Sequence, residues 1–306
     1  MKKIRVGVVG VGHIGSNHAR LYPEIPSADF TAVYDLDLAR GHAIGRKFNA
    51  LTAKSLDEFV ERVDAASVAT PTNTHYEVGR SLLEHGKHLL IEKPITDDTA
   101  HAAELVELAG RNGLILQVGH VERFNPVLSA LEKHLTHPRF IEAHRLSPYP
   151  KRSTDIGVVL DLMIHDLEII LHFVRSPVKS IDAVGVPVLS RGEDIANARL
   201  RFENSCVANV TSSRISPEQM RKIRVFQEDA YLSLDYQNQS GEIYRRAEGR
   251  ITRDRVEIER GEPLKRQLTS FIECASSGRE PRVSGFQATV ALELAVEITK
   301  RISASV

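Results

Sequence analysis

The chain has 306 residues, of which 42% are hydrophobic and 26% are charged, a balance typical of soluble globular domains. Its 40 Lys and Arg residues balance 40 Asp and Glu residues, so it lacks the strong basic excess of nucleic-acid-binding proteins, and we expect no nucleic-acid partner. Cys206 and Cys274 are too few for a disulfide framework, and their spacing fits no zinc site.

The first residues of the chain predict a buried strand rather than a secretion signal. The apolar stretch from Ile4 to Val11 is short, is interrupted by Gly7 and Gly10, and lacks a small-residue cleavage site. No apolar run reaches the roughly 18 residues of a membrane span. We therefore expect a cytoplasmic protein with no membrane partner.

Short apolar strands alternate with helices over the first 120 residues. We expect strands at 3–9, 30–34, 65–69, 87–91 and 114–118, and helices after the first strand, at 38–48, from 55, at 74–84 and at 97–112. Because such βαβ units close with right-handed crossovers, the pattern predicts an α/β domain with a doubly wound parallel sheet.

The pattern changes after about residue 120. We expect helices at 126–134, 156–174, 264–276 and 286–302, and several strands between 179 and 246 that include the hairpins 196–202/206–212 and 221–226/231–236. Strands joined by hairpins, with segregated helices, predict an α+β domain with a largely antiparallel open sheet. The expected domains are therefore 1–119 and 120–306.

A glycine motif connects the first strand to the first helix. Gly10 permits a tight turn, Gly12 lets the backbone approach a pyrophosphate, and Gly15 lets the helix pack on the strand. The helix N-terminus would then offer free N–H groups to the phosphates. The alternative is an ordinary strand-to-helix turn, which the motif alone does not distinguish.

An acidic residue follows the second strand, 20 positions after Gly15. Asp35 is placed to accept hydrogen bonds from the adenosine ribose and to repel a 2′-phosphate, which favours NAD over NADP. Arg40 lies within one helical turn and can soften that preference. The alternative for Asp35 is an exposed turn aspartate.

Two further loops follow strands that end at the same edge of the predicted sheet. The segment 69–75, Ala-Thr-Pro-Thr-Asn-Thr-His, suits contact with ribose or nicotinamide, or caps the next helix. Glu92-Lys93-Pro94 ends an apolar strand, so Lys93 would lie at the rim of the cofactor crevice, where an amine can polarise a substrate oxygen. The alternative for Lys93 is a solvated lysine at a strand end.

The apolar helix at 156–174 carries a polar stripe. At 100° per residue, Asp161, His165, Glu168 and His172 share one face, and Asp161 can fix the tautomer of His165 as in a general-base pair. The alternative is a hydrogen-bonded His–Asp pair in the core. A metal site would need a third suitably spaced ligand, which we do not find, so we expect no metal.

Together, these motifs resemble the Gfo/Idh/MocA family of NAD(P)-dependent sugar oxidoreductases, in the family's order and approximate spacing and over nearly the whole chain. The resemblance implies a Rossmann domain followed by an α+β domain whose open sheet mediates oligomers, so we expect a homodimer or homotetramer through the C-terminal sheet. It also implies catalytic roles for Lys93, Asp161 and His165. The expected cofactor-binding residues are Gly10, Gly12, His13, Ile14, Gly15, Asp35, Arg40, Thr70, Pro71, Thr72, Asn73, His75, Glu92 and Lys93.

Within the family, segments 119–126 and 159–168 resemble the branch that oxidises the C3 hydroxyl of UDP-N-acetylglucosamine to a ketone. A small-molecule sugar or UDP-sugar is therefore the expected substrate. Arg123, Lys151 and Arg152 are either diphosphate partners, because guanidinium pairs well with phosphate, or solvated surface charges. The expected substrate-binding residues are Lys93, Arg123, Asn125, Arg152, Asp161 and His165.

The expected mechanism is hydride transfer from the substrate carbon to NAD. His165 takes the alcohol proton, Asp161 orients His165, and Lys93 stabilises the developing alkoxide, although Lys93 as the base is an open alternative. Both versions require the amine and the imidazole to converge on the nicotinamide ring. Competing functions are oxidation of a free polyol such as an inositol, and a catalytically silent NAD-binding sensor.

Overall fold

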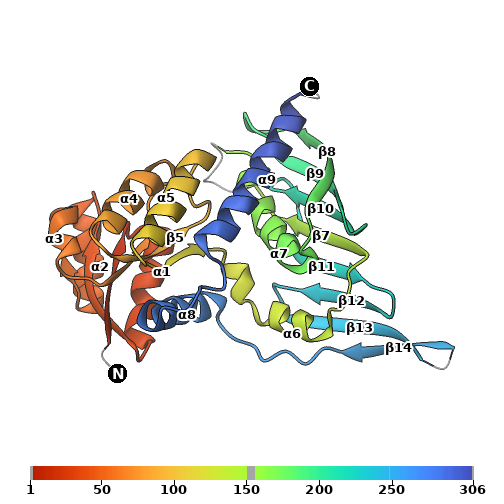
Figure 1. Cartoon of the computed structure of the whole chain (residues 1–306), viewed down its shortest axis with the longest axis horizontal. Coiled ribbons are helices and arrows are strands. Elements are labelled where there is room, and N and C mark those ends of the chain that lie inside the picture. Colours follow the sequence, from red (N-terminus) through yellow and green to blue (C-terminus); the bar gives the residue numbers. More distant parts are fainter. Residues whose placement is uncertain (1–2, 150–155, 248, 305–306) are drawn as a thin grey trace. The chain divides into compact units, whose positions relative to one another are not determined.

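The computed structural model describes residues 3–149, 156–247 and 249–304, and the chain forms two compact units (Figure 1). The first unit contains the residues up to Val121 together with Glu262–Thr289. The second contains Glu122–Gly261 and the residues from Val290 onward. The last helix, α9 (Gly285–Ala304), begins in the first unit and ends in the second.

The first unit is built on a six-stranded sheet in which every neighbouring pair is parallel, in the order β3-β2-β1-β4-β5-β6. This arrangement confirms the predicted doubly wound sheet. The strand order reverses between β1 and β4, which is where such sheets bind ligands. The strands are β1 (Ile4–Val9), β2 (Ala28–Tyr34), β3 (Leu51–Thr52), β4 (Ala65–Val68), β5 (His88–Glu92) and β6 (Leu116–Gly119).

Helices connect these strands, and their ends follow local capping chemistry. The helices are α1 (His13–Leu21), α2 (Leu38–Phe48), α3 (Leu56–Val60), α4 (His75–Glu84) and α5 (Thr99–Arg111), with 3₁₀ turns η1 (Tyr22–Glu24) and η2 (Thr72–Thr74). The Asp37, Ser55 and Asp98 side chains accept backbone N–H groups at the starts of α2, α3 and α5. Capping of this kind satisfies amide groups that have no partner inside the helix.

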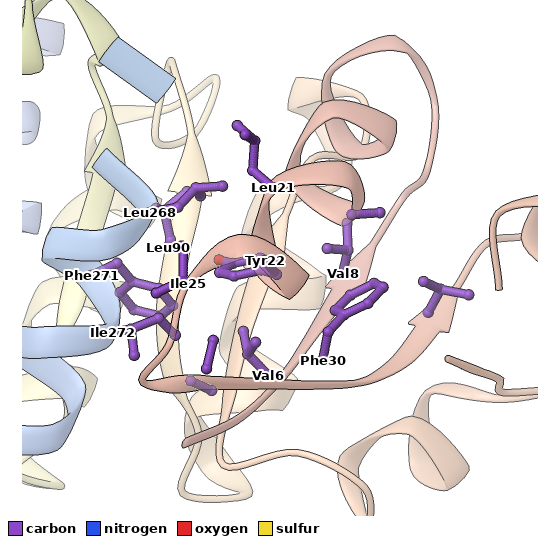
Figure 2. Packing of buried hydrophobic residues seen from close by; sticks show 14 of the residues in the cluster. Val6, Val8, Leu21, Tyr22, Ile25, Phe30, Leu90, Leu268, Phe271 and Ile272 are labelled. Carbon is purple, nitrogen blue, oxygen red and sulfur yellow. The ribbon is translucent and has the colours of Figure 1, made fainter. Parts of the chain in front are cut away.

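Helix α8 (Pro263–Ser277) belongs to the first unit although it follows the strands of the second. Its Leu268, Phe271 and Ile272 are buried in one apolar cluster with Tyr22 and Ile25, as Figure 2 shows. The division of the chain therefore differs from the expected 1–119 and 120–306. The amphipathic pattern of α8 predicts a buried face but does not identify the surface that buries it.

The second unit is built on an eight-stranded sheet in the order β14-β13-β12-β11-β7-β10-β9-β8. Only β7 and β10 are parallel neighbours, and every other pair is antiparallel, which confirms the predicted sheet. Helices α6 (Pro126–His134) and α7 (Ile164–Val174) lie against one face (Figure 1). The strands are β7 (Phe140–Leu146), β8 (Val178–Val186), β9 (Ile195–Phe202), β10 (Val207–Ser213), β11 (Met220–Phe226), β12 (Ala230–Asp235), β13 (Ser240–Ala247) and β14 (Arg250–Arg255).

Three elements of the second unit differ from the expectation. β14 lies beyond the range 179–246 in which strands were expected. β7 was not predicted, because its buried positions are Ile141, Ala143 and the charged Arg145, so its apolar alternation is interrupted. The helix predicted at 156–174 begins instead with a π-helical turn at Val159–Met163 before α7. None of the helices within the described ranges combines the length and hydropathy needed to span a bilayer.

Candidate functional site

The glycine loop has the backbone that a bound pyrophosphate needs. Gly10 has φ +80°, and a Cβ there would lie 2.8 Å from the Ala69 carbonyl oxygen. A Cβ at Gly15 would collide with the Gly10 carbonyl oxygen, whereas one at Gly12 would meet open space. Gly12 is also the N-cap of α1 and supplies no capping side chain. The loop therefore leaves the helix N-terminus accessible to an anionic group, as a dinucleotide site requires.

Asp35 is buried beside the glycine loop rather than exposed in a turn. Its carboxylate accepts hydrogen bonds from the backbone N–H groups of Val11 (2.8 Å) and Asp37 (2.8 Å). Burial would raise the pKa of Asp35, but hydrogen bonds from Arg40 and from these two amides outweigh it and lower the pKa. Asp35 therefore remains an anion that connects β2 to the loop after β1.

Arg40 forms a two-point ion pair with Asp35. Its Nε donates at 3.0 Å and its Nη2 at 2.7 Å to the two carboxylate oxygens, and its own side chain is half exposed. The guanidinium thus lies beside the acid expected to bind the ribose.

The surface around this ion pair is exposed, and it includes one candidate residue that was not predicted from the sequence. His13 and Ile14 are exposed at the start of α1. Leu36 is 87% exposed directly after Asp35, a position at which an apolar side chain can cover an adenine ring. A large apolar residue immediately after the acid expected to bind the ribose is the signal that could have identified Leu36 as a candidate.

The segment after β4 is held by its own polar groups. The Thr74 hydroxyl donates to Thr70 Oγ1 (2.8 Å) and to the Pro71 carbonyl oxygen (2.7 Å), and it makes no cap on α4. The helix-capping alternative is therefore wrong for Thr74. Thr70 and Thr72 are half-buried, and Pro71 and Asn73 are exposed.

His75 differs from its neighbours because its side chain is buried. Its Nδ1 lies 2.9 Å from the Pro94 carbonyl oxygen, and its Nε2 lies 2.9 Å from the Thr70 carbonyl oxygen. The residue is 1% exposed, and burial lowers the pKa of its imidazole while the two carbonyl groups oppose that effect. His75 thus joins two loops internally, and its burial argues against the expected direct contact with a cofactor.

Lys93 directly follows β5 and is half-buried. The carboxylate of the preceding residue, Glu92, lies with Oε1 3.2 Å from Nε2 of the buried His18 on α1. The same carboxylate packs against Gly119 at the end of β6, where a Cβ would come within 2.5 Å of it. Glu92 is therefore engaged inside the first unit, beside the lysine.

In the second unit, Asp161 and His165 are both half-buried near the start of the helical segment 159–174. Asp161 lies in the π-helical turn, so the 100° spacing assumed for a regular α-helix does not describe its direction. π-helical turns are rare, and they are frequent at functional sites.

The expected polar stripe does not continue along α7. Glu168 is 2% exposed and accepts a hydrogen bond from Arg123 Nη1 at 2.8 Å, so it faces the interior. His172 is half-buried and pairs with Glu132 at 3.2 Å. Each polar residue of the stripe thus has its own surroundings, because the sheet and the neighbouring segments cover different parts of the helix.

A buried network of ion pairs joins α7 to β7. Arg145 donates through Nε and Nη2 to Asp166 at 2.8 and 3.1 Å, and through Nη1 to Glu122 at 3.0 Å. Asp166 directly follows His165 in the chain. The network therefore connects β7, the segment after β6 and the helix that carries the imidazole.

Two of the expected substrate ligands belong to these internal contacts. Arg123 is 1% exposed opposite Glu168, and Asn125 is 3% exposed, where it caps α6 and donates to the Tyr236 carbonyl oxygen. The burial of Arg123 argues against its expected contact with a diphosphate, and the burial of Asn125 argues against its expected contact with the substrate. Lys151 and Arg152, the other two candidates, lie outside the described residues.

Asp194 and Arg214 form another buried ion pair that the sequence reasoning missed. Arg214 Nε donates to Asp194 Oδ1 at 2.8 Å, and its Nη1 donates to the Ile156 carbonyl oxygen at 2.7 Å. Glu193 accepts from the Val159 N–H at 3.2 Å. The loop before β9 therefore holds the beginning of the segment that carries Asp161. Among the described residues, no group of three or more His, Cys, Asp or Glu side chains is arranged to hold a metal ion.

Comparison with known proteins matches both units. Residues 4–120 match the family described as "Oxidoreductase family, NAD-binding Rossmann fold", and residues 131–233 match the "GFO/IDH/MocA C-terminal domain". The chain is 33% identical to UDP-N-acetylglucosamine 3-dehydrogenase of Acidithiobacillus ferrooxidans over 99% of each chain. A solved structure of that enzyme, GnnA, matches with a TM-score of 0.95 over 99% of both chains. The scyllo-inositol 2-dehydrogenase (NAD(+)) of Bacillus subtilis is 25% identical over 97% of this chain and 93% of its own.

Proposed function

Because the chain belongs to the Gfo/Idh/MocA family of oxidoreductases, we propose that it oxidises C3 of UDP-N-acetylglucosamine with NAD, giving the 3-keto nucleotide sugar. The observation that carries this substrate is the full-length likeness to UDP-N-acetylglucosamine 3-dehydrogenase. The overall reaction balances as a secondary alcohol plus NAD⁺ giving a ketone, NADH and one proton.

The first unit fits NAD on the geometry of its own residues. The open position at Gly12, the free start of α1 and the buried anion Asp35 suit the pyrophosphate and the ribose. The accessible residues of the loop after β4, Thr70 to Asn73, suit the nicotinamide half. When bound, NAD supplies the acceptor for the hydride that leaves the substrate carbon.

The chain's own residues handle the proton and the charge on the reacting oxygen. We assign His165 as the base that takes the hydroxyl proton, with Asp161 orienting the imidazole. Lys93 donates a hydrogen bond to the same oxygen and stabilises its negative charge as the carbonyl forms. In the alternative assignment Lys93 takes the proton and His165 positions the substrate.

The decisive experiment incubates the protein with NAD and a panel of UDP-sugars and free polyols, with hydroxylamine to trap the ketone. Absorbance of the reduced nicotinamide should rise with UDP-N-acetylglucosamine, and mass spectrometry should identify the trapped 3-keto sugar. If none of the sugars in the panel led to the formation of NADH, the proposal would be refuted. A ketone formed from an inositol instead would support a polyol dehydrogenase, the function favoured by the likeness to scyllo-inositol 2-dehydrogenase.

Two variants test the catalytic roles. Lys93→Met and His165→Ala should each lower kcat by about 10²–10⁴-fold while NADH still binds. If both residues act in one step, the double variant should be hardly slower than the worse single variant, because groups that act as a unit are not additive. Full activity in either single variant would remove that residue from the mechanism.

The pocket for the diphosphate is tested through Arg152. A nucleotide-sugar site should lose affinity with rising salt and in Arg152→Ala, whereas a polyol site should respond to neither. Equal KM values for the wild type and Arg152→Ala would remove this residue from the substrate site.

The outer face of the second sheet supports a homo-oligomer. Four aromatic rings meet across adjacent strands, one pair tilted with centroids 5.5 Å apart and two pairs stacked at 4.5 and 5.1 Å. Phe140, Phe226 and Tyr231 alternate with the buried positions of their strands, so they lie on the face opposite the buried one. The rings are Phe140, Phe226, Tyr231 and Tyr244. We propose that a second copy covers them, giving a homodimer or homotetramer. Sedimentation should show the oligomer, and Tyr231→Lys should shift it toward the monomer; a monomeric wild type would refute this.

We also propose a cytoplasmic location, since NAD and nucleotide sugars are intracellular metabolites and both Cys206 and Cys274 are free thiols. Fractionation of the source cells with an antibody to the protein tests this, and recovery in an extracellular fraction would contradict it.

A further inference from the structure

Two buried histidines of the first unit flank Lys93, and the proposed function gives neither of them a role. We propose that His18 and His75 are positioning residues that fix Lys93 from both sides, His18 through Glu92 and His75 through Pro94. This inference rests on the proposed function, because it assumes that the Lys93 amine acts on the reacting oxygen.

His75 holds the residue that follows Lys93. Its ring lies between two carbonyl oxygens, that of Pro94 after β5 and that of Thr70 after β4, at 2.9 Å from each. Both partners can only accept, and a neutral imidazole carries one N–H, so the ring donates to one of the two carbonyl oxygens and lies in close contact with the other. At 1% exposure the ring is shielded from water. The ring therefore joins the ends of two neighbouring strands at the edge where the cofactor is expected.

His18 lies against the residue that precedes Lys93, in a close approach that does not have the geometry of a hydrogen bond. Its side chain is 0% exposed on α1, and its Nε2 lies 3.2 Å from Glu92 Oε1. The Glu92 carboxylate is confined on another side by Gly119, where any Cβ would collide with it. The His18 ring is itself fixed edge-on against Tyr22, with ring centroids 6.4 Å apart at 84°.

These contacts are additional to those that build the sheet. β5 is already paired along its length with β4 and with β6. The histidine contacts act instead on the residues at and beyond the end of the strand, where the chain leaves the ladder. A catalytic group displaced by about 1 Å can lose about 10²-fold in rate, so fixing both neighbours of Lys93 has a direct kinetic value.

Three variants and one matched control test the proposal. His75→Leu removes both carbonyl contacts, and His75→Gln keeps an amide N–H that can donate to one of them. Gly119→Ala pushes the Glu92 carboxylate from its place beside His18 without removing any polar group. The control is His85→Gln, a histidine on the exposed end of α4 that also contacts a backbone carbonyl oxygen, that of Ser81.

The kinetic result expected is a loss confined to kcat. His75→Leu should lower kcat by about tenfold or more and Gly119→Ala by about threefold or more, while KM and the Kd for NADH change by less than about threefold. His75→Gln should retain more activity than His75→Leu, and His85→Gln should match the wild type. Loss of NADH affinity in parallel with kcat would overturn the proposal in favour of a structural role in the cofactor loop.

A second readout needs no substrate. A brief pulse of acetic anhydride, followed by peptide mass spectrometry, gives the acylation rate of Lys93 relative to Lys87, a half-buried lysine just before the opposite end of β5. The ratio should rise by about threefold or more in His75→Leu and in Gly119→Ala, because the lysine is less confined. An unchanged ratio in both variants would refute the proposal.

The two readouts also separate this proposal from the proposed function. If the wild type oxidises no sugar, the proposed function fails and the acylation ratio alone decides whether the histidines fix Lys93. If the wild type is active, Lys93→Met is inactive and His75→Leu is fully active, only the positioning role fails. If His75→Leu does not fold, Gly119→Ala decides between the outcomes through both readouts.

Discussion

Replacing Arg145 by methionine removes the cation at the centre of the buried network in the second unit. Arg145 is 4% exposed, and its guanidinium donates to Asp166 and to Glu122, which are 1% and 6% exposed. Methionine approximates the length of the side chain, so the change leaves little cavity. It leaves two carboxylates buried without their main counter-ion.

The magnitude follows from that imbalance. Breaking a buried ion pair by removing one partner costs about 3–5 kcal/mol, because the remaining charge stays desolvated. The second unit has about 160 residues, and each kcal/mol shifts the Tm of a domain of that size by about 2–4 °C. We therefore expect Arg145→Met to lower the unfolding temperature of this unit by about 6–20 °C at pH 7.

Differential scanning calorimetry measures the effect, with Arg199→Met as the matched control. Arg199 lies on β9 of the same sheet, but it is only half-buried and donates to Asn209 at 3.0 Å. Substitution of such a group should cost less than about 0.5 kcal/mol. A Tm for Arg145→Met within about 2 °C of the control would refute the reasoning about the network.

The effect of Arg145→Met on Tm should also depend on pH, in a direction that a simple packing defect would not give. Burial would raise the pKa of Glu122, but the charges of Arg145 and Arg221 outweigh it and lower the pKa. In the wild type this stabilisation is present above the unfolded pKa of about 4.3 and is lost as the pH falls through the folded value. In Arg145→Met the effect of burial on Glu122 is less opposed, so the pKa of Glu122 rises and protonation of its carboxylate relieves the defect. The difference in Tm between the wild type and Arg145→Met should therefore become smaller as the pH falls from 7 to 4.

Three further outcomes follow from the two units. Gly10→Ala should weaken NADH binding by about tenfold or more and destabilise the first unit by about 1–3 kcal/mol, because φ is +80° and the new Cβ would press on the Ala69 carbonyl group. Fluorescence titration measures the first effect, and thermal melts measure the second. Asp35→Asn should lower NADH affinity by about tenfold and narrow the gap between NADH and NADPH affinities, both measured by nucleotide fluorescence; an unchanged ratio would remove Asp35 from the ribose site. Asp194→Asn leaves Arg214 buried without its anion, so the second unit should melt about 6–20 °C lower; a Tm equal to that of the wild type would contradict the ion pair's role.

The parts predicted from the sequence are those that local rules control. The glycine loop and Asp35 were identified because a φ near +80° requires glycine and because one βα unit sets the distance to the next strand end. Five of the six strands of the first sheet were found because they are largely buried and mostly apolar, whereas β3, a two-residue strand that is not buried, was not predicted.

The parts that failed depend on partners distant in the chain. β7 was missed because an inward-facing arginine interrupts its pattern, and that arginine is explained by Asp166 and Glu122, 21 and 23 residues away. The assignment of His75 to the cofactor stays a prediction, and its burial against the carbonyl oxygens of Pro94 and Thr70 is a feature that the motif did not indicate.

The sequence by itself therefore determined most of the secondary-structure elements and which residues on them are candidates for the chemistry, since spacing, turn chemistry and hydrophobic period are local properties. Only the tertiary structure decided which polar groups are buried and with whom they pair. Arg123 and Arg145 illustrate the reason: a charged side chain has the same sequence signature at the surface and in the core, and its role is fixed only when a carboxylate from another element is brought within hydrogen-bonding distance.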